Sequence, residues 1–343
     1  AVAYTAGIRS VFHRKKRSTV HYVHSNRKGD VMLKYVLKRL GYILVTLWVI
    51  VTCTFFMMKN LPGTPFDAER FSIMTPQQQE RVLEMYGLND SLPMQYVKYI
   101  KNMLKGDLGT SFTYVNQDVS KVITGRLGPS ALIGIQAVLI GLAIGLILGI
   151  LAAWKHNSGI DYFTMILAVL GVSVPNFVAA ALLQYYIGLK WGALPVGFWT
   201  GWNCSVLPSI ALSFSATAMV ARFMRTEMLD VLDQDYIVTA RAKGLSQMKV
   251  LMRHAVRNSI LPVVTILGPI VVNLMTGSLA VENIFSIPGI GSLFVDCIKA
   301  NDYPVIMGIT IFYAAFYMLI VLLVDLAYSL IDPRIRLAKG KES

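Results

Sequence analysis

Six apolar runs divide the chain, and each is about as long as a helix must be to cross a lipid bilayer. They lie at residues 40–58, 130–153, 162–188, 205–223, 260–282 and 305–331. The hydrocarbon core of a bilayer is spanned by about 20 residues of helix. Inside that core only a helix or a closed barrel pairs all of its backbone polar groups. We therefore predict an all-α integral membrane protein with six transmembrane helices.

Composition supports the membrane class and explains the charge. The 343 residues are 55% hydrophobic and only 15% charged, whereas soluble domains average about 25% charged residues. In a soluble protein a net charge of +13 would suggest binding to nucleic acid. In a membrane protein the excess of Lys and Arg in the loops on the inner side explains the same charge, and we predict no nucleic-acid partner.

The distribution of basic residues predicts the orientation. An even number of spans places both termini on one side of the membrane, together with the loop at residues 223–260. That side carries 22 Lys and Arg residues and the opposite side carries 10. Because basic residues are retained inside, we expect both termini and this loop to be cytoplasmic.

Residues 1–31 form a basic tail before the first apolar run. The tail contains seven Lys or Arg residues and one acid, Asp30, with no apolar period, which is typical of a disordered segment. Such a tail can bind anionic lipid. The alternative, which we favour, is a natural start at Met32, since MLKYVLKRL leads directly into the first run. Deletion of the tail is then expected to leave function intact.

Residues 59–128 form the one sizeable region outside the membrane, and the charge distribution places it on the extracellular side. Thr75 and Gln78 match a capping box, and Gly87 follows where the helix that they start should end. A second amphipathic helix is predicted from about Pro93. We expect two short helices in this region.

A long polar and basic insert, residues 233–262, separates the fourth and fifth apolar runs. Asp233 or Asp235 is placed to cap a first helix, and Gly244 suits the left-handed position that ends many helices. Ser246 is placed to cap a second helix, which Pro262 stops or kinks. The second helix is expected to carry an apolar stripe of Met248, Leu251, Met252, Ala255 and Val256.

The segment TARAKGL at residues 239–245 resembles the cytoplasmic "EAA" loop of ABC-importer permeases, in the form of the peptide and nickel branch. The resemblance continues in His254, Arg257, Asn258 and Pro262. The generic motif places Glu-Ala-Ala six to four residues before the glycine. Here only Ala240 and Gly244 match it, whereas Val238 and Thr239 depart from it.

In that family the loop forms coupling helices that sit in a cleft of the ATPase subunit. The resemblance therefore implies a set of ATPase-docking residues. They are Asp235, Tyr236, Thr239, Ala240, Arg241, Ala242, Lys243, Gly244, Leu245, His254 and Arg257. The alternative is a loop that only connects two spans, with basic residues that serve topology alone.

Residues 277–306 form an outer loop in which Pro288 and Gly289 interrupt an apolar run, as expected where backbone turns back at membrane depth. The loop resembles the family's re-entrant segment near the extracellular mouth. Glu282 either lines the pathway, where it would meet the amino terminus of a peptide, or pairs with a backbone N–H or a basic residue of a partner subunit. The implied pathway residues are Pro175, Asn176, Glu282, Asn283, Pro288, Gly289, Asp302 and Tyr303.

Several other residues have a structural interpretation. Gly171, Pro175 and Asn176 break the third run, which either shapes a pore or improves helix packing. A stripe of Gly141, Gly145 and Gly149 indicates close helix packing. The five histidines form no set of metal ligands, and we predict no metal site. A disulfide between Cys204 and Cys297 is left open.

The source of energy is indicated by what the predicted spans lack. Ion-coupled carriers and pumps keep ionisable groups inside the membrane, but here Gln184 is not ionisable and Glu282 and Asp325 lie near the ends of their spans. The chain contains no phosphate-binding Gly-x-x-x-x-Gly-Lys-Ser/Thr loop. We predict a transport subunit that is not an enzyme and binds no cofactor, with ATP and Mg bound by partner ATPases.

The resemblance covers roughly residues 32–337 and implies a six-span permease in the plasma membrane of a bacterial cell. It is most similar to the first (B-type) permease of oligopeptide importers, and the dipeptide and nickel branches are not separated from it. The implied partners are a second permease in a heterodimer, two ATPases, an extracellular binding protein and the peptide. A self-sufficient channel or secondary carrier is the competing class, and a membrane-embedded enzyme is a third class.

This interpretation divides the chain into five parts. They are the basic tail at 1–31, the first span with its lead-in at 32–58, the extracellular helical region at 59–128, the permease core at 129–337 with the coupling loop 223–260, and a cytoplasmic tail at 338–343.

Overall fold

A computed structural model describes residues 37–60, 71, 73–85, 87–114, 117–275 and 278–331. The chain divides into two units, Ala1–Thr52 and Cys53–Ser343, and each is treated by itself. The basic tail and the cytoplasmic tail proposed above lie outside the described residues. Within the described ranges every regular element is a helix, apart from one isolated bridge between Thr110 and Asp118.

Five helical stretches in the described part are long and apolar enough to cross a membrane, and a bent pair of helices makes a sixth. The first is the helix Leu37–Lys59. The others contain α5 (Val119–Trp154), α8 (Val206–Leu232), α11 (Arg257–Met275) and α14 (Tyr303–Ile331). The all-α membrane class and the number of spans expected from the apolar runs are therefore confirmed.

The bent pair corresponds to the third apolar run. α6 (Gly159–Ser173) is followed by α7 (Asn176–Leu183) and a π-helical segment, η1 (Gln184–Lys190), and the two halves are bent by 100°. Pro175 precedes α7 with an extended backbone, which favours a break because proline lacks the N–H that would continue the helix. The break predicted in this run is confirmed.

α5 starts earlier than the second apolar run. It begins at Val119, after Asp118, and it contains Pro129. One face of its first turns is apolar and buried, because Val119 and Ile123 pack in a cluster with residues of α13 (Ile290–Lys299) and α14. Local preference alone would favour a helix boundary at the proline. The packing stabilises the helix enough that it continues past this residue.

Two short helices lie in the region after the first span, as predicted. α3 spans Pro76–Met85 and α4 spans Leu92–Leu104. The capping box before α3 is confirmed, because the Thr75 N–H donates to Gln78 Oε1 at 2.9 Å and the Gln78 N–H donates to Thr75 Oγ1 at 3.4 Å. α4 is anchored by Tyr96, whose ring lies 5.4 Å from that of Phe55.

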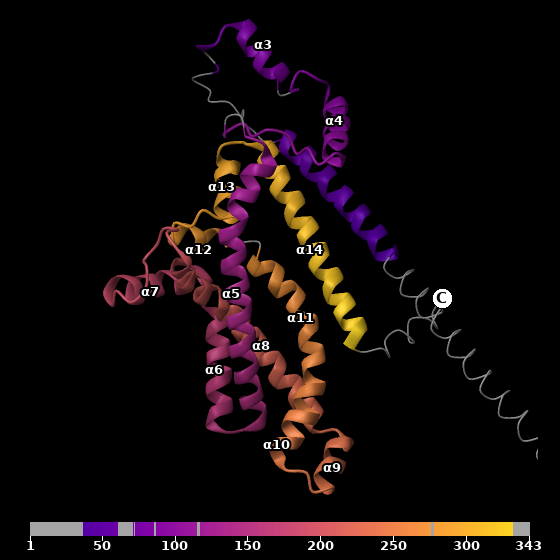
Figure 1. The fold of residues 1–343 in the computed structure, drawn as a ribbon, viewed down its shortest axis with the longest axis vertical. Coiled ribbons are helices and arrows are strands. Elements are labelled where there is room, and N and C mark those ends of the chain that lie inside the picture. Colours follow the sequence, from indigo (N-terminus) through magenta and orange to yellow (C-terminus); the bar gives the residue numbers. More distant parts are fainter. Residues whose placement is uncertain are drawn as a thin grey trace, which may run out of the picture. The chain divides into compact units, whose positions relative to one another are not determined.

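α8 is the central helix of the second unit and packs against α5, α6, α7 and α11 (Figure 1). Three glycines of α5 permit its close contact with α8. A Cβ atom on Gly149 would lie 2.6 Å from the backbone oxygen of Ala221, and Gly141 and Gly145 show similar close approaches. The packing interpretation of this glycine stripe is confirmed.

The outer segment after α11 contains two short helices, α12 (Leu279–Ile284) and α13. α12 packs against α7 and α8, and α13 packs against α14 and α5. Gln184 links the bent span to α12, since its Nε2 donates to the backbone oxygens of Ile284 and Val196, both at 2.7 Å. Figure 1 shows α13 at one end of α5 and the insert that follows α8 at the other end.

Candidate functional site

The polar insert after α8 folds into two helices joined by a tight turn, as predicted. α9 spans Asp235–Ala242, and a second helical stretch begins with α10 (Gln247–Lys249). The residue that precedes α9 with an extended backbone is Gln234, so the prediction that Asp233 or Asp235 caps it is wrong. Asp235 lies in the first turn instead, where a negative charge interacts favourably with the free N–H groups of the helix.

Gly244 ends α9 in the left-handed conformation, with φ of 76°. Its N–H donates to the backbone oxygen of Arg241 at 2.9 Å, and the N–H of Leu245 donates to that of Ala240 at 3.4 Å. These two bonds form a Schellman motif. A Cβ atom on Gly244 would meet nothing within 4 Å. Glycine is therefore favoured here by the backbone conformation and not by lack of space.

A small apolar core fixes α9 to its neighbours. Ile237 and Ala240 of α9 pack with Val250, and Val231 and Leu232 near the end of α8 cover them. The side chain of Ile237 is fully buried, which contributes about 1.5–3 kcal/mol relative to an exposed position. Because this buried face fixes α9, the opposite face of the helix is exposed to solvent in one orientation.

The second helical stretch buries only part of the stripe predicted for it. α10 is followed by η3, a π-helical segment at Val250–Val256. Leu251 and Ala255 are buried, whereas Met248 and Met252 are 52% and 53% exposed, so only part of the predicted stripe faces the interior. A π-helical turn has more residues than an α-helical turn, which shifts the buried face away from the spacing used in the prediction.

Pro262 does not stop this helix. It lies inside α11, and α10, η3 and α11 follow one another without a loop. Ser259 of α11 also contacts α8, since its Oγ donates to the backbone oxygen of Glu227 at 3.3 Å. The insert is thus continuous with one long helix and bonded to another.

Most of the residues predicted to dock an ATPase lie on the surface of the insert. Ala240 is buried in the small core and His254 is half-buried. Tyr236 also contacts α11, because its hydroxyl oxygen accepts a hydrogen bond from Asn258 Nδ2 at 2.9 Å. The exposed members are Asp235, Tyr236, Thr239, Arg241, Ala242, Lys243, Gly244, Leu245 and Arg257.

The insert exposes apolar side chains beside basic ones. Tyr236, Val238, Met248 and Met252 are between 41% and 59% exposed. The exposed basic residues are Arg241, Lys243, Lys249, Arg253 and Arg257. Exposed apolar side chains with charged neighbours are typical of surfaces that bind another protein.

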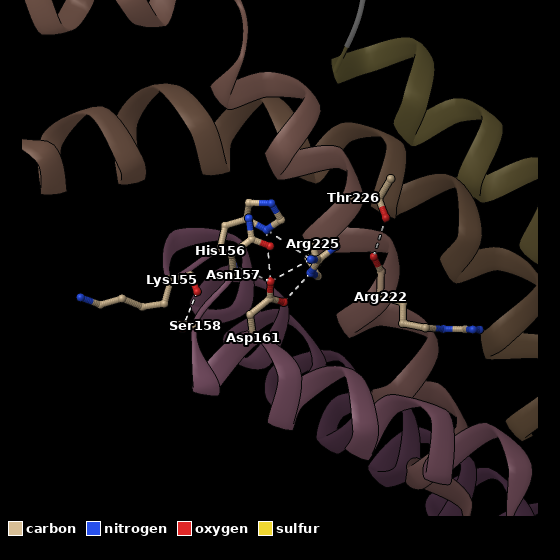
Figure 2. A network of polar contacts seen from close by, with 8 residues as sticks. All are labelled: Lys155, His156, Asn157, Ser158, Asp161, Arg222, Arg225 and Thr226. Atoms are coloured by element: carbon tan, nitrogen blue, oxygen red, sulfur yellow. Dashed lines mark hydrogen bonds and ion pairs between the residues drawn. The ribbon is translucent and has the colours of Figure 1, made fainter.

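A buried carboxylate joins α6 to α8 (Figure 2). Asp161, in the first turn of α6, accepts two hydrogen bonds from Arg225 of α8, from Nε at 2.6 Å and from Nη2 at 2.8 Å. It also accepts one from the N–H of Asn157 at 3.0 Å, and His156 Nδ1 lies 3.1 Å from it. The Asp161 side chain is 3% exposed.

Sequence reasoning missed this pair, because Asp161 and Arg225 lie just beyond the ends of the apolar runs as they were drawn. A signal was present in the sequence. An acid in the first turn of one membrane helix and a cation in the last turns of another are costly in apolar surroundings unless they pair.

Among the predicted pathway residues, Glu282 has its carboxylate inside the protein. Ser130 Oγ donates to its Oε1 at 2.7 Å, and the N–H of Ser292 donates to its Oε2 at 2.9 Å. Gly289 packs directly on the carboxylate, since a Cβ atom there would lie 2.3 Å from the carboxyl carbon. Of the two alternatives for Glu282, contact with a backbone N–H is the one observed. Its contact with a substrate stays a prediction.

Asp302 is also buried, and it connects the start of α14 with the segment before α5. It accepts hydrogen bonds from the Ser111 hydroxyl and from the backbone N–H groups of Phe112 and Thr113, the latter two at 3.1 Å. The neighbouring Tyr303 is 9% exposed, and its ring lies 6.2 Å from that of Phe112. In this conformation both residues organise the protein interior.

Replacement of Asp302 by Ala is expected to lower the free energy of unfolding by about 1–3 kcal/mol, because buried donors lose their acceptor. The measurement is the melting temperature of the purified protein in detergent. Asp296→Ala is the matched control, since Asp296 is an exposed acid on α13. An equal loss of stability in the two variants would contradict the role given to Asp302.

The other predicted pathway residues differ in exposure. Pro175 and Asn283 are exposed, Asn176 and Pro288 are half-buried, and Gly289 is buried. Exposure alone does not show contact with a substrate. Their role in a pathway stays a prediction.

The possible disulfide is absent from the structure. Cys204 and Cys297 are both free and both buried. Burial, helped by the nearby acids Asp302 and Asp296, raises the pKa of the Cys297 thiol to about 12. The thiol is therefore protonated and unreactive at neutral pH.

Comparison with known proteins gives consistent matches over most of the chain. The family model described as "Binding-protein-dependent transport system inner membrane component" matches residues 145–337, and that described as "Binding-prot-dependent transport system membrane comp, N-term" matches residues 32–128. The dipeptide transport system permease protein DppB of Lactococcus lactis subsp. cremoris is 46% identical over 306 residues, which are 89% of this chain and 100% of the relative.

Two further similarities complete the comparison. The oligopeptide transport system permease protein OppB of Haemophilus influenzae is 39% identical over 307 residues, 89% of this chain and 100% of the relative. A solved structure titled "Crystal structure of an amino acid ABC transporter with histidines" aligns with a TM-score of 0.47 and 20% identity, and covers 63% of this chain and 94% of that one.

Proposed function

The chain belongs to the family of binding-protein-dependent transport system inner membrane components, and we propose that it is the permease subunit of an ATP-driven peptide importer. The relatives that support peptides as the substrate class are named as dipeptide and oligopeptide permeases and are matched over their whole length. The relatives include permeases named for both substrate sizes, and a nickel importer is the alternative within the same branch.

The proposed location is the plasma membrane of a bacterial cell, with both termini inside. The excess of Lys and Arg on the side of the termini supports this orientation. The insert that contains α9 and α10 then faces the cytoplasm, and α3 and α4 lie outside. A second permease completes the pathway, and an extracellular binding protein delivers the peptide.

The observation that carries the proposal is the construction of the insert. α9 has its own apolar core, ends in a Schellman motif at Gly244, and leaves apolar and basic side chains exposed around it. Because ordered apolar surface is costly to leave in water, this arrangement favours a partner that covers it. An ATPase subunit, which would bind the ATP and Mg, is the partner that the family membership implies.

Coupling follows from how the insert is connected. α10 continues through η3 into α11, and α9 rests on the end of α8. When two ATPases close on ATP, displacement of the insert would therefore move α8 and α11 directly. Packed helices then rock as bodies between inward-open and outward-open arrangements, as in other rigid-body transitions.

Uptake by proteoliposomes tests the proposal. Vesicles that hold the chain with its second permease, its two ATPases and its binding protein are expected to accumulate a labelled peptide only when ATP is supplied. Vesicles that hold the chain alone are the control, and no peptide is expected to cross their membrane. Flux through the chain alone would instead indicate a channel or carrier, and conversion of a lipid or peptide without nucleotide would indicate an embedded enzyme.

A further inference from the structure

α6 is attached to α8 at both of its ends, by two different kinds of contact. Near the bend, Gly171 allows close approach, since a Cβ atom there would lie 3.0 Å from the backbone oxygen of Phe214 and from Cβ of Ala218. At the opposite end the attachment is polar, through Asp161 and Arg225.

The polar attachment has a defined geometry. The two nitrogens of Arg225 reach the two different carboxylate oxygens of Asp161, which is the fork arrangement that fixes orientation as well as distance. The remaining contacts come from the turn before α6, where Asn157 has a φ of 56° and its N–H points at the same carboxylate. The pair therefore sets the position of both α6 and the turn that leads into it.

The helix that carries Arg225 is also the helix that supports the insert. Met224 and Met228, on either side of Arg225, are fully buried in one apolar cluster with Leu251 and Ala255 of η3. Beyond them the end of α8 covers the core of α9. A displacement of the insert therefore reaches Arg225 through packed side chains.

From α6 the path continues to the opposite side of the protein. α6 leads into the bent pair, and Gln184 after the bend bonds to the backbone of α12. Among the described hydrogen bonds and ion pairs, those between Asp161 and Arg225 are the ones that join α6 to α8. A buried ion pair adds little net stability compared with apolar side chains of similar size, so its geometry points to positioning.

We propose that Asp161 and Arg225 are a positioning pair that makes α6, and with it the bent span, move together with the docking insert during transport. This inference rests on the proposed function. Without the pair, hydrolysis would continue at the ATPases while a smaller share of cycles moved the bent span. The signature is therefore a change in peptide taken up per ATP hydrolysed, which a purely stabilising contact would not alter.

The test uses the complete transporter in proteoliposomes and the double variant Asp161→Asn with Arg225→Gln, which leaves no unpaired charge. Peptide uptake per ATP hydrolysed is expected to fall about fivefold or more, the lower range of coupling between linked sites, while the ATPases still co-purify. The control is Asp90→Asn with Lys98→Gln, an exposed pair that involves α4, and its ratio is expected to stay unchanged.

An unchanged ratio of peptide taken up to ATP hydrolysed in the Asp161/Arg225 variant would overturn the inference, even if uptake and hydrolysis both fall. If the double-variant protein does not accumulate in the membrane, the single variant Arg225→Lys is tested in its place. Lys keeps the positive charge but cannot bond both carboxylate oxygens through a planar fork. A lowered ratio is expected for it, and a wild-type ratio would overturn the inference. Failure of the wild-type complex to take up peptide with ATP would count against the proposed function instead.

Discussion

Replacement of Gly244 by Val is expected to abolish most ATP-driven peptide uptake while the chain still inserts in the membrane. Gly244 has a φ of 76°, and a β-branched residue in the left-handed region pays a strain of about 1–2 kcal/mol. Such a strain lowers the equilibrium constant of the present turn against other conformations by roughly 5- to 30-fold. The orientation of α9 depends on that turn, so docking of the ATPase should be lost with it. Uptake by proteoliposomes is the measurement.

The matched control for this variant is Gly244→Asn. Asn has a similar size but adopts the left-handed conformation far more readily, and the space around Gly244 is open in this chain. Uptake by the Asn variant is expected to stay close to that of the wild type. If both variants fail equally, the glycine is required for close contact with the partner and not for the backbone conformation.

Replacement of Gly149 by Ala should destabilise the protein through the contact between α5 and α8. The added Cβ atom would lie 2.6 Å from the backbone oxygen of Ala221 and 2.8 Å from Cβ of Met224. Neither atom can rotate away, so the two helices must separate, which costs about 1–3 kcal/mol. The measurement is the midpoint of thermal unfolding of the purified protein in detergent.

Gly125→Ala provides a control with the opposite sign. Gly125 lies in the same helix, but a Cβ atom there would meet nothing within 4 Å. Ala favours a helix over Gly by about 1 kcal/mol, so this variant is expected to raise the midpoint slightly or leave it unchanged. A similar drop for Gly125→Ala and Gly149→Ala would contradict the tight packing of α5 on α8.

The number of spans and the two-helix insert were predictable, because both depend on local rules. The thickness of a bilayer sets the length of an apolar run, and Gly244 marks a left-handed turn whatever surrounds it. The capping box at Thr75 is equally local. The break around Pro175 follows from the missing N–H of proline.

What could not be predicted depends on packing between distant segments. α5 runs through Pro129 because one face of its first turns is buried against α13 and α14. Met248 and Met252 are exposed although regular helical spacing places them on one stripe with Leu251, which is buried. The partners of Asp161 and Asp302 lie far away in sequence, and no local pattern identifies which cation or N–H group will face a given carboxylate.

We propose that the insert after α8 is the docking site for an ATPase. Site-specific photo-crosslinking in the intact membrane tests it most directly, with the photoreactive residue at Met248, which is 52% exposed. The control position is Val97 on α4, which is 58% exposed. A crosslink is expected from Met248 to a protein that mass spectrometry identifies as an ATPase with a phosphate-binding loop, and none is expected from Val97. An ATPase crosslinked from Val97, or no ATPase from Met248, would contradict it.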